Sequence, residues 1–342
     1  MALRDIIGIG GSAGSTEALK EVLSRLPAGL QASIFITTHL RAGRRQYLAE
    51  VLQRGCALPV QVAEESEAVL PGRIYLATPE AHLLVLKTGV MLGMGPRENM
   101  VRPAIDPMLR SLAMTYGPRV IGVILSGALN DGASGLLAIK QCGGVTVVQS
   151  LDDAQAPDMP EAAIEAAEPD HIATASTIGA LLAGLVGTEA PHAPPCPIEV
   201  RLEVEIAAGA RLGSDRLRRI ATPVALSCPN CHGVLSEVAD AKPLRYRCQI
   251  GHAVTGEMLT ETKKEETEEA LRLAMRVMEE RAELVDRMGK DAHRQGRSLI
   301  AELYEGRHKE YAAHAEILRK AVLAGLGTMV EDEVEGSDPE SA

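Results

Sequence analysis

The sequence has no tryptophan and a single phenylalanine among its 342 residues, so a folded core has to be packed mainly from aliphatic side chains. Hydrophobic residues make up 46% of the chain, which is enough for a sizeable core. Basic residues are outnumbered by acidic ones, 35 to 46, so the formal net charge is -11. Nucleic acids and anionic lipid surfaces are polyanions that an acidic chain repels, so neither is expected as a partner.

Long apolar runs are absent as well. The most apolar later stretch, residues 178–186, is far shorter than the roughly 20 residues that a membrane-spanning helix needs. The N-terminus lacks the apolar segment and the cleavage site of a signal peptide. We therefore expect a cytoplasmic protein that does not insert into a membrane. Of the six cysteines, three lie between residues 228 and 248, which in a reducing compartment indicates metal binding rather than disulfides.

Short aliphatic runs alternate with amphipathic stretches from about residue 6 to residue 186. This pattern predicts an α/β fold with a doubly wound, mostly parallel sheet. Strands are expected over residues 6–9, 33–37, 72–76, 120–125, 145–149 and 171–174. Helices are expected over residues 16–26, 47–53, 106–115, 133–141, 160–166 and 177–186. Residues 60–93 are expected to form β-hairpin structure inserted on the sheet.

Composition divides the chain into five predicted parts. They are an α/β domain (1–187), a linker (188–222), a small module around the cysteines (223–256), a helical hairpin (257–326) and a disordered acidic tail (327–342). The linker is placed by four prolines between Thr188 and Pro197, which neither a helix nor a sheet ladder tolerates. The apolar stripe of the hairpin is explained by packing of its two helices, by docking of partner helices or by self-association, and the sequence does not choose among these.

A glycine-rich turn, GIGGSAGS, follows the first predicted strand and precedes the first predicted helix, at the sheet edge where open α/β folds bind ligands. Gly8, Gly10 and Ala13 satisfy a dinucleotide-binding pattern, but that pattern requires an acidic residue at the end of the second strand, where His39 stands. Ser12 is alternatively a helix cap, or a nucleophile whose hydroxyl faces a base while nearby N–H groups bind an oxyanion.

A nucleophilic serine needs an imidazole within hydrogen-bonding reach and a carboxylate behind it. His39 ends the second predicted strand, and Asp131 follows the predicted strand at residues 120–125 and opens a helix. Considered alone, His39 could have a purely structural role, and Asp131 could cap the helix that follows it. Ser12, His39 and Asp131 nevertheless all fall at strand-to-helix turns on one edge of the sheet. Three residues with unrelated structural roles would have no reason to share one edge, so their common location favours a catalytic set.

Six segments occur in the order IIGIGGSAGSTEAL, IFITTHL, LPGRIYLATPEAHLLV, VRPAIDPMLRSLA, GVILSGALNDGASGLLAIKQCGGVTVVQ and DMPEAAI. They cover most of residues 5–185, and this part of the chain resembles the catalytic domain of bacterial chemotaxis protein-glutamate methylesterases. The resemblance implies that Ser12 is the nucleophile, His39 the base and Asp131 the carboxylate of the set.

The resemblance also implies the surroundings of the reacting carbonyl. Backbone N–H groups near Ala13 and near Ala128 or Leu129 are expected to line the oxyanion site, and the turn at Met159 is expected to border the cleft. Arg102, in the segment VRPAID, is a candidate for binding substrate by orienting an acidic receptor helix. The ordinary role of such an arginine is a salt bridge or a solvated surface position.

The function implied is that of a serine hydrolase that removes methyl esters from glutamate residues of methyl-accepting chemoreceptor-type proteins. Deamidation of glutamine by the same acyl chemistry is left open, and no cofactor is expected for catalysis. The alternative is a non-catalytic signalling adaptor that keeps the fold and binds receptor or partner helices.

The cysteine cluster has the spacing of a zinc ribbon. Cys228 and Cys231 form a C-x2-C pair, and Cys248 and His252 form a C-x3-H pair sixteen residues further on. Zinc takes four such ligands tetrahedrally, and a segment this small has little other means of holding its fold. His232 is an alternative ligand, and a group of reduced cysteines without metal is the alternative to the site as a whole. We expect a structural zinc ion.

Overall fold

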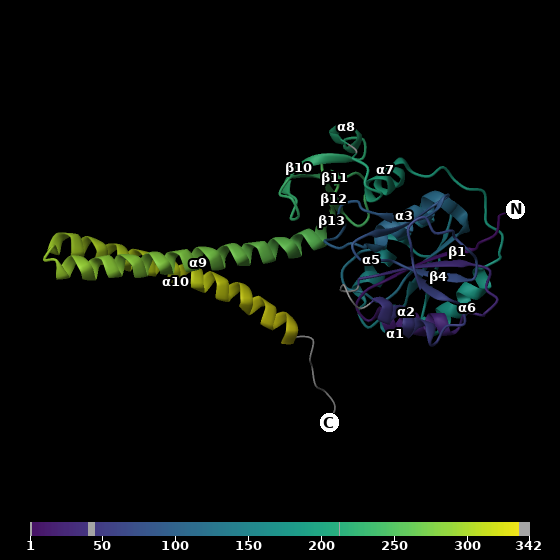
Figure 1. Cartoon of the computed structure of the whole chain (residues 1–342), viewed down its shortest axis with the longest axis horizontal. Helices are drawn as coiled ribbons and strands as arrows, with labels where there is room; N and C mark the ends of the chain where they lie inside the picture. The colour runs from purple at the N-terminus through teal and green to yellow at the C-terminus, as the bar shows by residue number, and fades with distance from the viewer. Residues whose placement is uncertain (1, 40–44, 212, 335–342) are drawn as a thin grey trace, which may run out of the picture. The chain divides into compact units, whose positions relative to one another are not determined.

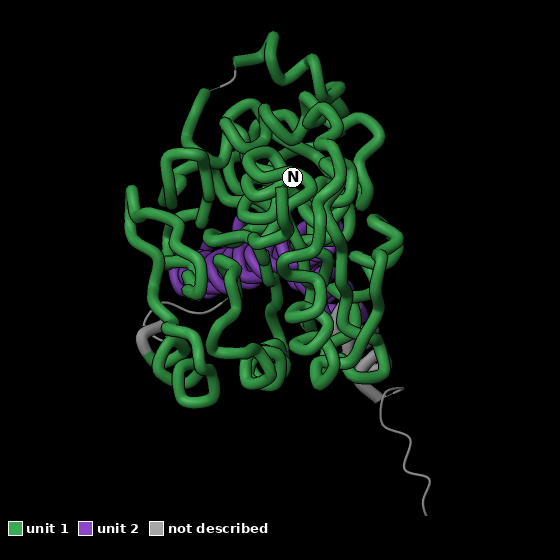
Figure 2. Tube along the Cα trace, turned by 90° about the vertical axis from the view of Figure 1, so that its right-hand side faces the viewer, with its two compact units in different colours: residues 1–259 green, residues 260–342 purple. Residues whose placement is uncertain are grey.

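The computed structural model describes residues 2–39, 45–211 and 213–334 (Figure 1). The chain divides into two compact units, Met1–Leu259 and Thr260–Ala342 (Figure 2). The first unit contains the α/β domain together with a small four-stranded module. The second contains most of the two long C-terminal helices.

A seven-stranded parallel sheet forms the centre of the first unit, with the strand order β3-β4-β2-β1-β7-β8-β9. Its strands are β1 (Ile6–Gly11), β2 (Ser33–Thr38), β3 (Val60–Val62), β4 (Arg73–Leu76), β7 (Val120–Ile124), β8 (Val145–Gln149) and β9 (His171–Ala173). The chain builds outward from β1 in both directions, so a topological switch point lies between β1 and β7. The predicted parallel α/β fold is confirmed.

Helices cover both faces of this sheet (Figure 1). One face carries α1 (Ser15–Ser24), α2 (Arg45–Gln53) and α6 (Ala175–Leu185), and the other carries α3 (Ile105–Tyr116), α4 (Ala133–Gln141) and α5 (Asp158–Ala167). Because successive strand side chains point to opposite faces, Ile7 and Ile9 enter the first core and Ile6 enters the second. Two short 3-10 helices, η1 (Gly117–Arg119) and η2 (Leu151–Asp153), lie in the connections.

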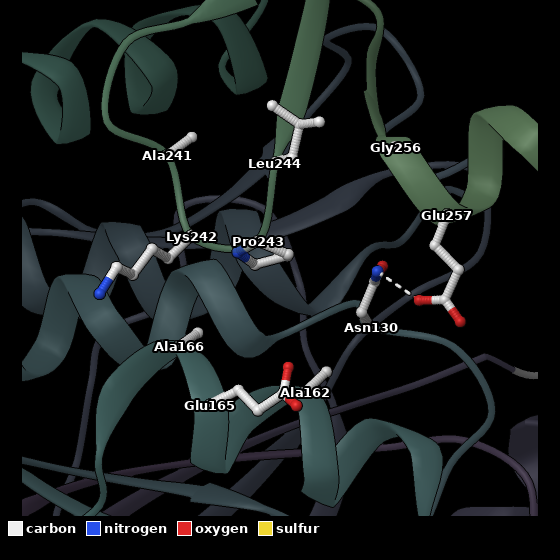
Figure 3. Close-up of a pocket in the computed structure, with 10 residues that line it drawn as sticks. All are labelled: Asn130, Ala162, Glu165, Ala166, Ala241, Lys242, Pro243, Leu244, Gly256 and Glu257. Atoms are coloured by element: carbon white, nitrogen blue, oxygen red, sulfur yellow. Dashed lines mark hydrogen bonds between the residues drawn. The ribbon is translucent and has the colours of Figure 1, made fainter.

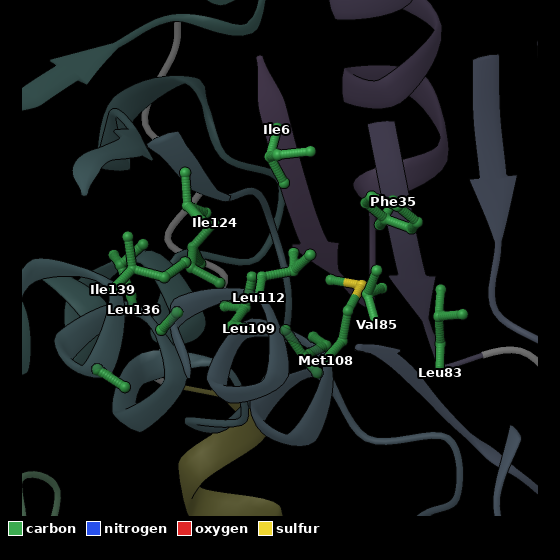
Figure 4. Packing of buried hydrophobic residues seen from close by; sticks show 14 of the residues in the cluster. Ile6, Phe35, Leu83, Val85, Met108, Leu109, Leu112, Ile124, Leu136 and Ile139 are labelled. Atoms are coloured by element: carbon green, nitrogen blue, oxygen red, sulfur yellow. The ribbon is translucent and has the colours of Figure 1, made fainter. Parts of the chain in front are cut away.

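On the α3 side, β1 carries glycine where larger side chains would otherwise stand. A Cβ atom at Gly8 would lie 2.6 Å from Leu112 Cδ1, and one at Gly10 would lie 2.3 Å from Ile105 Cγ2. Helix α3 therefore approaches the sheet closely, and Leu109 and Leu112 are buried in the core between them (Figure 4). The glycine pattern that resembles a dinucleotide-binding motif is thus explained by helix packing.

Residues 60–93, predicted as β-hairpin structure, are divided between two sheets. The strands β5 (His82–Leu86) and β6 (Gly89–Gly93) form an antiparallel hairpin, which packs against α3 through Leu83 and Val85 (Figure 4). By contrast, β3 and β4 pair in parallel within the central sheet. Strand β4 confirms the strand predicted at residues 72–76. The hairpin prediction is wrong for β3, because a strand this short does not reveal the direction of its pairing in the sequence.

The predicted linker, residues 188–222, is ordered in its second half. Helix α7 (Ile198–Ala207) buries Val200, Leu202 and Ile206, and the short helix α8 (Gly213–Leu217) follows it. The linker prediction is wrong for α7. Its sequence, IEVRLEVEIA, alternates charged and apolar residues without a clear helical stripe, and one of the charges, Glu203, is itself buried. Residues 191–197 carry neither helix nor strand, as the prolines require.

The cysteine module is a four-stranded antiparallel sheet of β10 (Ala221–Ser227), β11 (Val234–Val238), β12 (Arg245–Cys248) and β13 (Ala253–Thr255). A buried group of charges joins it to the α/β domain. Arg247 of β12 contacts Glu98 at 2.9 Å and Glu203 of α7 at 3.0 Å, and Arg110 of α3 contacts the same two carboxylates. Since an unpaired buried charge is strongly destabilising, these contacts fix the module against α3.

The second unit is a helical hairpin, as predicted. Helices α9 (Gly256–Arg294) and α10 (Ser298–Val334) pack through small and aliphatic side chains, among them Ala282, Val285 and Ala315. Helix α10 continues to Val334, so the prediction of a disordered tail is wrong for residues 327–334, and residues 335–342 lie outside the described residues. Within the described part of the chain, we find no helix that is both long and apolar enough to span a membrane.

Candidate active site

Ser12, His39 and Asp131 lie at one edge of the central sheet. They follow β1, β2 and β7, which are neighbours in the order β2-β1-β7 and run in the same direction. The carboxyl ends of these strands therefore meet beside the switch point, which is where open α/β folds place their sites. Helices α1 and α4 begin just beyond Ser12 and Asp131, so both side chains stand at sharp strand-to-helix turns.

The three side chains form a hydrogen-bonded chain. His39 Nε2 lies 2.7 Å from Asp131 Oδ2, and His39 Nδ1 lies 3.2 Å from Ser12 Oγ. With Nε2–H donating to the carboxylate, Nδ1 is left to accept the Ser12 hydroxyl proton. The side chain of Asp131 is 3% exposed and that of His39 is 19% exposed, so the carboxylate is enclosed while the imidazole reaches the surface.

Further hydrogen bonds reach the Asp131 carboxylate from the protein. Its oxygens accept from the amides of Ile105 at 2.7 Å and Asp106 at 3.2 Å, in the first turn of α3, and from Asn99 Nδ2 at 3.3 Å. The positive end of the α3 dipole favours an anion there. Burial acts to raise the pKa of Asp131, but the bonds from His39 and the two amides hold this pKa below its ordinary value. The carboxylate is therefore charged at neutral pH and can stabilise an imidazolium.

Neither Ser12 nor Asp131 caps the helix that follows it. Gly14 is the N-cap residue of α1 and Gly132 that of α4; both have positive φ, and neither has a side chain that could cap its own helix. Helix capping therefore does not explain the serine, and Asp131 instead accepts the first amides of α3, which lies earlier in the chain. The two glycines permit the left-handed backbone of these turns.

The turn of Ser12 is held by Ser126, which stands just after β7. Ser12 N donates to Ser126 O at 2.9 Å, and Ser126 Oγ donates to Ala13 O at 2.7 Å. Ser126 Oγ also accepts from Ala156 N at 2.9 Å, in the segment that leads into α5. Three loops at the edge of the sheet are thus tied together, and this fixes the position of the Ser12 hydroxyl relative to the imidazole.

The backbone groups expected to bind an oxyanion differ in their partners. Ala13 and Ala128 are exposed, and their N–H groups have no hydrogen-bond partner within the described part of the chain. Leu129 N, by contrast, faces Asp158 Oδ2 at 3.4 Å, and Leu129 has a φ of 61°. Between the two alternatives left by the sequence, Ala128 therefore has the more available amide.

Met159 lies behind the serine rather than on an open rim. Its side chain is fully buried, and a Cβ atom at Gly127 would lie 2.6 Å from Met159 Cε and 3.1 Å from Ser12 Cβ. Gly127 thus leaves room for both side chains. Met159 N donates to Gly127 O at 2.9 Å, so the start of α5 is bonded to the same loop.

Arg102 is bound within its own neighbourhood. Its Nη1 atom donates to the carbonyl oxygens of Gly95 at 2.8 Å and Met94 at 3.3 Å, and Nη2 lies 3.8 Å from Glu80 Oε2. These contacts support the salt-bridge alternative, and the role of Arg102 in orienting substrate stays a prediction.

A cavity of about 480 Å³ lies between α5 and the cysteine module (Figure 3). Its lining includes Ala162 and Glu165 of α5 and the turn at Pro243. Asn130, which precedes Asp131, stands at one end and donates to Glu257 in the first turn of α9 at 2.7 Å. The cysteine module and the start of α9 therefore reach the loop that carries Asp131.

Two residues contribute to the site in ways that the sequence did not predict. Asp106 Oδ1 accepts from the amides of Gly132 at 3.1 Å and Gly135 at 2.6 Å, at the start of α4. An aspartate near the start of a predicted helix indicates capping of that helix. It does not indicate that Asp106 caps the start of another helix, α4. Asn99 carries no such signal, because its contacts to Asp131 and to Thr255 depend entirely on the tertiary fold.

The predicted metal ligands Cys228, Cys231, Cys248 and His252 are brought together, with their ligand atoms all within 4.8 Å of one another. The Sγ atoms of Cys231 and Cys248 are 3.7 Å apart, and His252 Nδ1 lies 3.5 Å from Cys248 Sγ and 3.8 Å from Cys228 Sγ. Zinc bonds of about 2.1 to 2.3 Å in a tetrahedron require ligand separations of about 3.6 to 3.8 Å. The donor set thus fits zinc, and the alternative ligand His232 is not part of it.

Comparison with known proteins places this arrangement in a family. A Pectobacterium atrosepticum protein-glutamate methylesterase/protein-glutamine glutaminase is 39% identical over 171 residues, which are 49% of this chain and 49% of that protein. A Leptospira interrogans protein provisionally given the same name is 37% identical over 178 residues, which are 52% of this chain and 92% of that protein. The chain thus spans about half the length of the Pectobacterium relative.

A solved structure and a family model agree with these relatives. The crystal structure of the Thermotoga maritima CheB methylesterase catalytic domain matches with a TM-score of 0.52 and 31% identity, over 54% of this chain and all of that chain. The model of the CheB methylesterase family matches residues 7–182, from β1 into α6. This range is more than half of the chain and contains the whole Ser12–His39–Asp131 arrangement, and the chain belongs to the CheB methylesterase family.

Proposed function

We propose that this protein hydrolyses methyl esters of glutamate side chains on chemoreceptor-type proteins, with Ser12 as nucleophile, His39 as base and Asp131 as its supporting carboxylate. The observation that carries the proposal is the hydrogen-bonded chain from Ser12 Oγ through the His39 ring to Asp131 Oδ2, with distances of 3.2 and 2.7 Å. Membership of the CheB methylesterase family supports the same activity.

In the first half of the reaction, Ser12 Oγ attacks the ester carbonyl carbon while His39 Nδ1 takes the hydroxyl proton. The imidazolium that forms is stabilised by Asp131, whose Oδ2 atom holds the other ring N–H. His39 then gives its proton to the methoxy oxygen, the bond from carbon to that oxygen breaks, and methanol leaves. The product is an acyl-enzyme on Ser12.

The negative oxygen that forms during this attack needs N–H donors at the serine turn. The amides of Ala13 and Ala128 are the candidates, because both are exposed there and neither has a partner within the described residues. Leu129 N is the weaker candidate, since Asp158 already faces it.

In the second half of the reaction, His39 takes a proton from water and the resulting hydroxide attacks the acyl carbon. The bond to Ser12 Oγ breaks, the serine regains its proton from His39, and the glutamate carboxylate is released. A glutamine side chain enters the same sequence with ammonia in place of methanol as the leaving group. The name of the Pectobacterium relative includes the glutaminase activity, and we extend it to this chain as part of the proposal.

The Ser12→Ala variant tests this mechanism. We expect it to release no methanol from methylated receptor above the uncatalysed rate, because no hydroxyl remains to attack the ester. Ser24→Ala is the matched control, since Ser24 lies on the exposed side of α1 and its hydroxyl donates to Glu21 O at 2.9 Å, away from the three residues of the site. A fluorophosphonate probe should label the wild-type chain and the control but not Ser12→Ala. Undiminished methanol release from Ser12→Ala would exclude the mechanism.

We also propose that the cysteine module holds a structural zinc ion on Cys228, Cys231, Cys248 and His252, for which the donor types and separations are suitable. Zinc bound there would supply cross-links between the turns that flank β10 and β12 and would take no part in ester hydrolysis. A cytoplasmic location fits the proposed receptor substrates.

We further propose that two copies of the chain associate through α9 and α10. Exposed apolar residues on α9 support this, among them Leu273, Val277 and Leu284.

A further inference from the structure

Asn99 occupies a tight turn between β6 and α3. The turn is closed by two hydrogen bonds between Glu98 and Val101, of 3.2 and 3.0 Å. Asn99 has a φ of 49° and the following Met100 has a φ of 64°, both in the left-handed region. Asparagine adopts this region more readily than most residues with a side chain. The side chain of Asn99 is buried, so its amide group must find partners within the protein.

Both ends of the Asn99 amide have a partner. Asn99 Nδ2 donates to Asp131 Oδ1 at 3.3 Å, and Asn99 Oδ1 accepts from Thr255 N at 3.1 Å. The partners fix the orientation of the amide group, because a carboxylate only accepts and a backbone N–H only donates. Thr255 is the last residue of β13 and directly precedes α9. One side chain thus connects the catalytic carboxylate to the cysteine module.

The cysteine module holds the turn of Asn99 at other points as well. Asn99 N donates to Ala253 O at 2.9 Å, within β13. Asn230, which stands between the first two cysteines of the cluster, donates to Met100 Sδ at 3.2 Å. Arg247 pairs with Glu98 in the buried charge group. The turn is therefore fixed by β12, by β13 and by the loop of Cys228 and Cys231.

We propose that Asn99 is a positioning residue for ester hydrolysis, through which the cysteine module fixes the orientation of Asp131. This inference rests on the proposed function. Asp131 Oδ2 faces His39 and Ile105 N, whereas Oδ1 faces Asn99 and Asp106 N. Holding Oδ1 prevents rotation of the carboxylate, so Oδ2 stays on the His39 ring. The module outside the family match is thereby part of the support of the active site.

Three variants separate this role from general stability. Asn99→Gly removes the side chain, and glycine adopts a φ of 49° without strain. Asn99→Asp keeps an acceptor for Thr255 N but loses the N–H donor to Asp131. Met100→Leu is the matched control, because it removes the sulfur acceptor of Asn230 from the same turn and leaves both side-chain contacts of Asn99 in place.

We expect Asn99→Gly to lower kcat for methyl ester hydrolysis about tenfold with little change in KM, because it removes a hydrogen bond to a charged group behind the base. Met100→Leu should stay within about twofold of the wild type. A kcat of Asn99→Gly equal to that of Met100→Leu would overturn the proposal. The two variants should be compared at equal folded fraction, measured by calorimetry.

The pH dependence of Asn99→Asp gives a second readout, which a purely structural role would not change. The carboxyl group that this substitution introduces can donate to Asp131 when it is protonated, as the amide does, whereas its ionised form repels Asp131. The ratio of wild-type to variant kcat should therefore be small near about pH 5 and rise toward about pH 8. The other titratable groups near this contact are His39, Asp106, His82 and Glu98, and because both proteins contain them their effects largely cancel in the ratio. A ratio that is constant with pH would overturn the proposal.

A spectroscopic measurement distinguishes failure of this inference from failure of the proposed function. The His39 ring N–H that donates to Asp131 should give a downfield proton NMR signal whether or not the chain hydrolyses esters. We expect this signal to shift and exchange faster with water in Asn99→Gly, and to stay unchanged in Met100→Leu. An unchanged signal in Asn99→Gly would exclude the positioning role. Absence of ester hydrolysis together with a shifted signal would reject only the proposed function.

Discussion

Asp106 and Asp131 exchange helix caps. Asp131, two residues before the start of α4, accepts the amides of Ile105 and Asp106 at the start of α3. Asp106, in the first turn of α3, accepts the amides of Gly132 and Gly135 at the start of α4. The exchange holds the two helix starts together beneath the site. It also places two buried carboxylates side by side in different electrostatic surroundings.

The pKa values of the two carboxylates move in opposite directions. Burial, with a further contribution from the charge of Asp131, raises the pKa of Asp106 to about 7 although Arg110 opposes the change. The pKa of Asp131 is held below its ordinary value by the hydrogen bonds from His39 and the α3 amides. At neutral pH the charge of the pair therefore lies mainly on Asp131, the residue that faces the imidazole.

The raised pKa of Asp106 predicts a dependence of stability on pH. The folded state keeps the Asp106 proton up to about pH 7, whereas the unfolded chain loses it near the ordinary aspartate value of about 4. Between these values the unfolded state binds fewer protons, so the contribution of this group to stability falls as pH rises. Asp106→Asn removes the titration and keeps an oxygen acceptor for the α4 amides.

We therefore expect the unfolding free energy of Asp106→Asn, relative to the wild type, to increase from about pH 4 to about pH 7. Each pKa unit of displacement corresponds to about 1.4 kcal/mol at most. Calorimetry of both proteins across this range gives the difference directly, because effects of unchanged groups cancel. Parallel stability curves for the two proteins would contradict the assignment of the raised pKa to Asp106.

The sequence was sufficient for the central sheet and for the proximity of Ser12, His39 and Asp131. Each of these three residues follows an aliphatic run, and parallel strands bring such positions to one edge whatever the details of packing. The spacing of the cysteines and His252 likewise predicted that Cys228 and His252 lie close together, because such spacing reflects the local geometry of two turns. These predictions rest on local patterns whose spatial consequence is general.

The contacts that join the modules did not follow from such patterns. Glu203 and Arg247 are buried in a group of charges in which each pairs with the other and with charges of further elements. A charged residue considered alone is expected at the surface. Helix α7 was missed for this reason, since Glu203 interrupts its apolar pattern. Asn99 was missed because its partners, Asp131 and Thr255, are distant from it in sequence.

The metal site predicts different outcomes for two neighbouring histidines. His252 contributes Nδ1 to the ligand group, whereas His232 lies outside it. We expect purified wild-type protein to contain about one zinc ion per chain, and His252→Ala to contain much less, because three ligands leave the tetrahedron incomplete. His232→Asn is the matched control and should keep its zinc, since asparagine also tolerates the φ of 57° at this position. Elemental analysis of the three purified proteins measures their zinc content per chain. Wild-type protein without zinc, or loss of zinc from His232→Asn, would contradict the ligand assignment.

The close approach of α3 to the sheet predicts that Gly10 is sensitive to a single added methyl group. In Gly10→Ala the new Cβ atom would lie 2.3 Å from Ile105 Cγ2, so helix α3 or the Ile105 side chain must shift. We expect a loss of about 1 to 3 kcal/mol in unfolding free energy, measured by calorimetry. Gly29→Ala is the control, because Gly29 is exposed and has nothing within 4 Å of the added atom.

The same substitution should also reach the active site. Ile105 N donates to Asp131 Oδ2, the oxygen that faces His39, so displacement of α3 by Gly10→Ala should lower the rate of ester hydrolysis as well as stability. Ile105→Ala removes the clashing methyl group and keeps the backbone amide. If the clash is the cause, Gly10→Ala combined with Ile105→Ala will be less destabilised than the sum of the single changes. Strict additivity would show that the clash with Ile105 is not the cause of the destabilisation. A Gly10→Ala protein as stable and active as Gly29→Ala would show that β1 and α3 tolerate a side chain here.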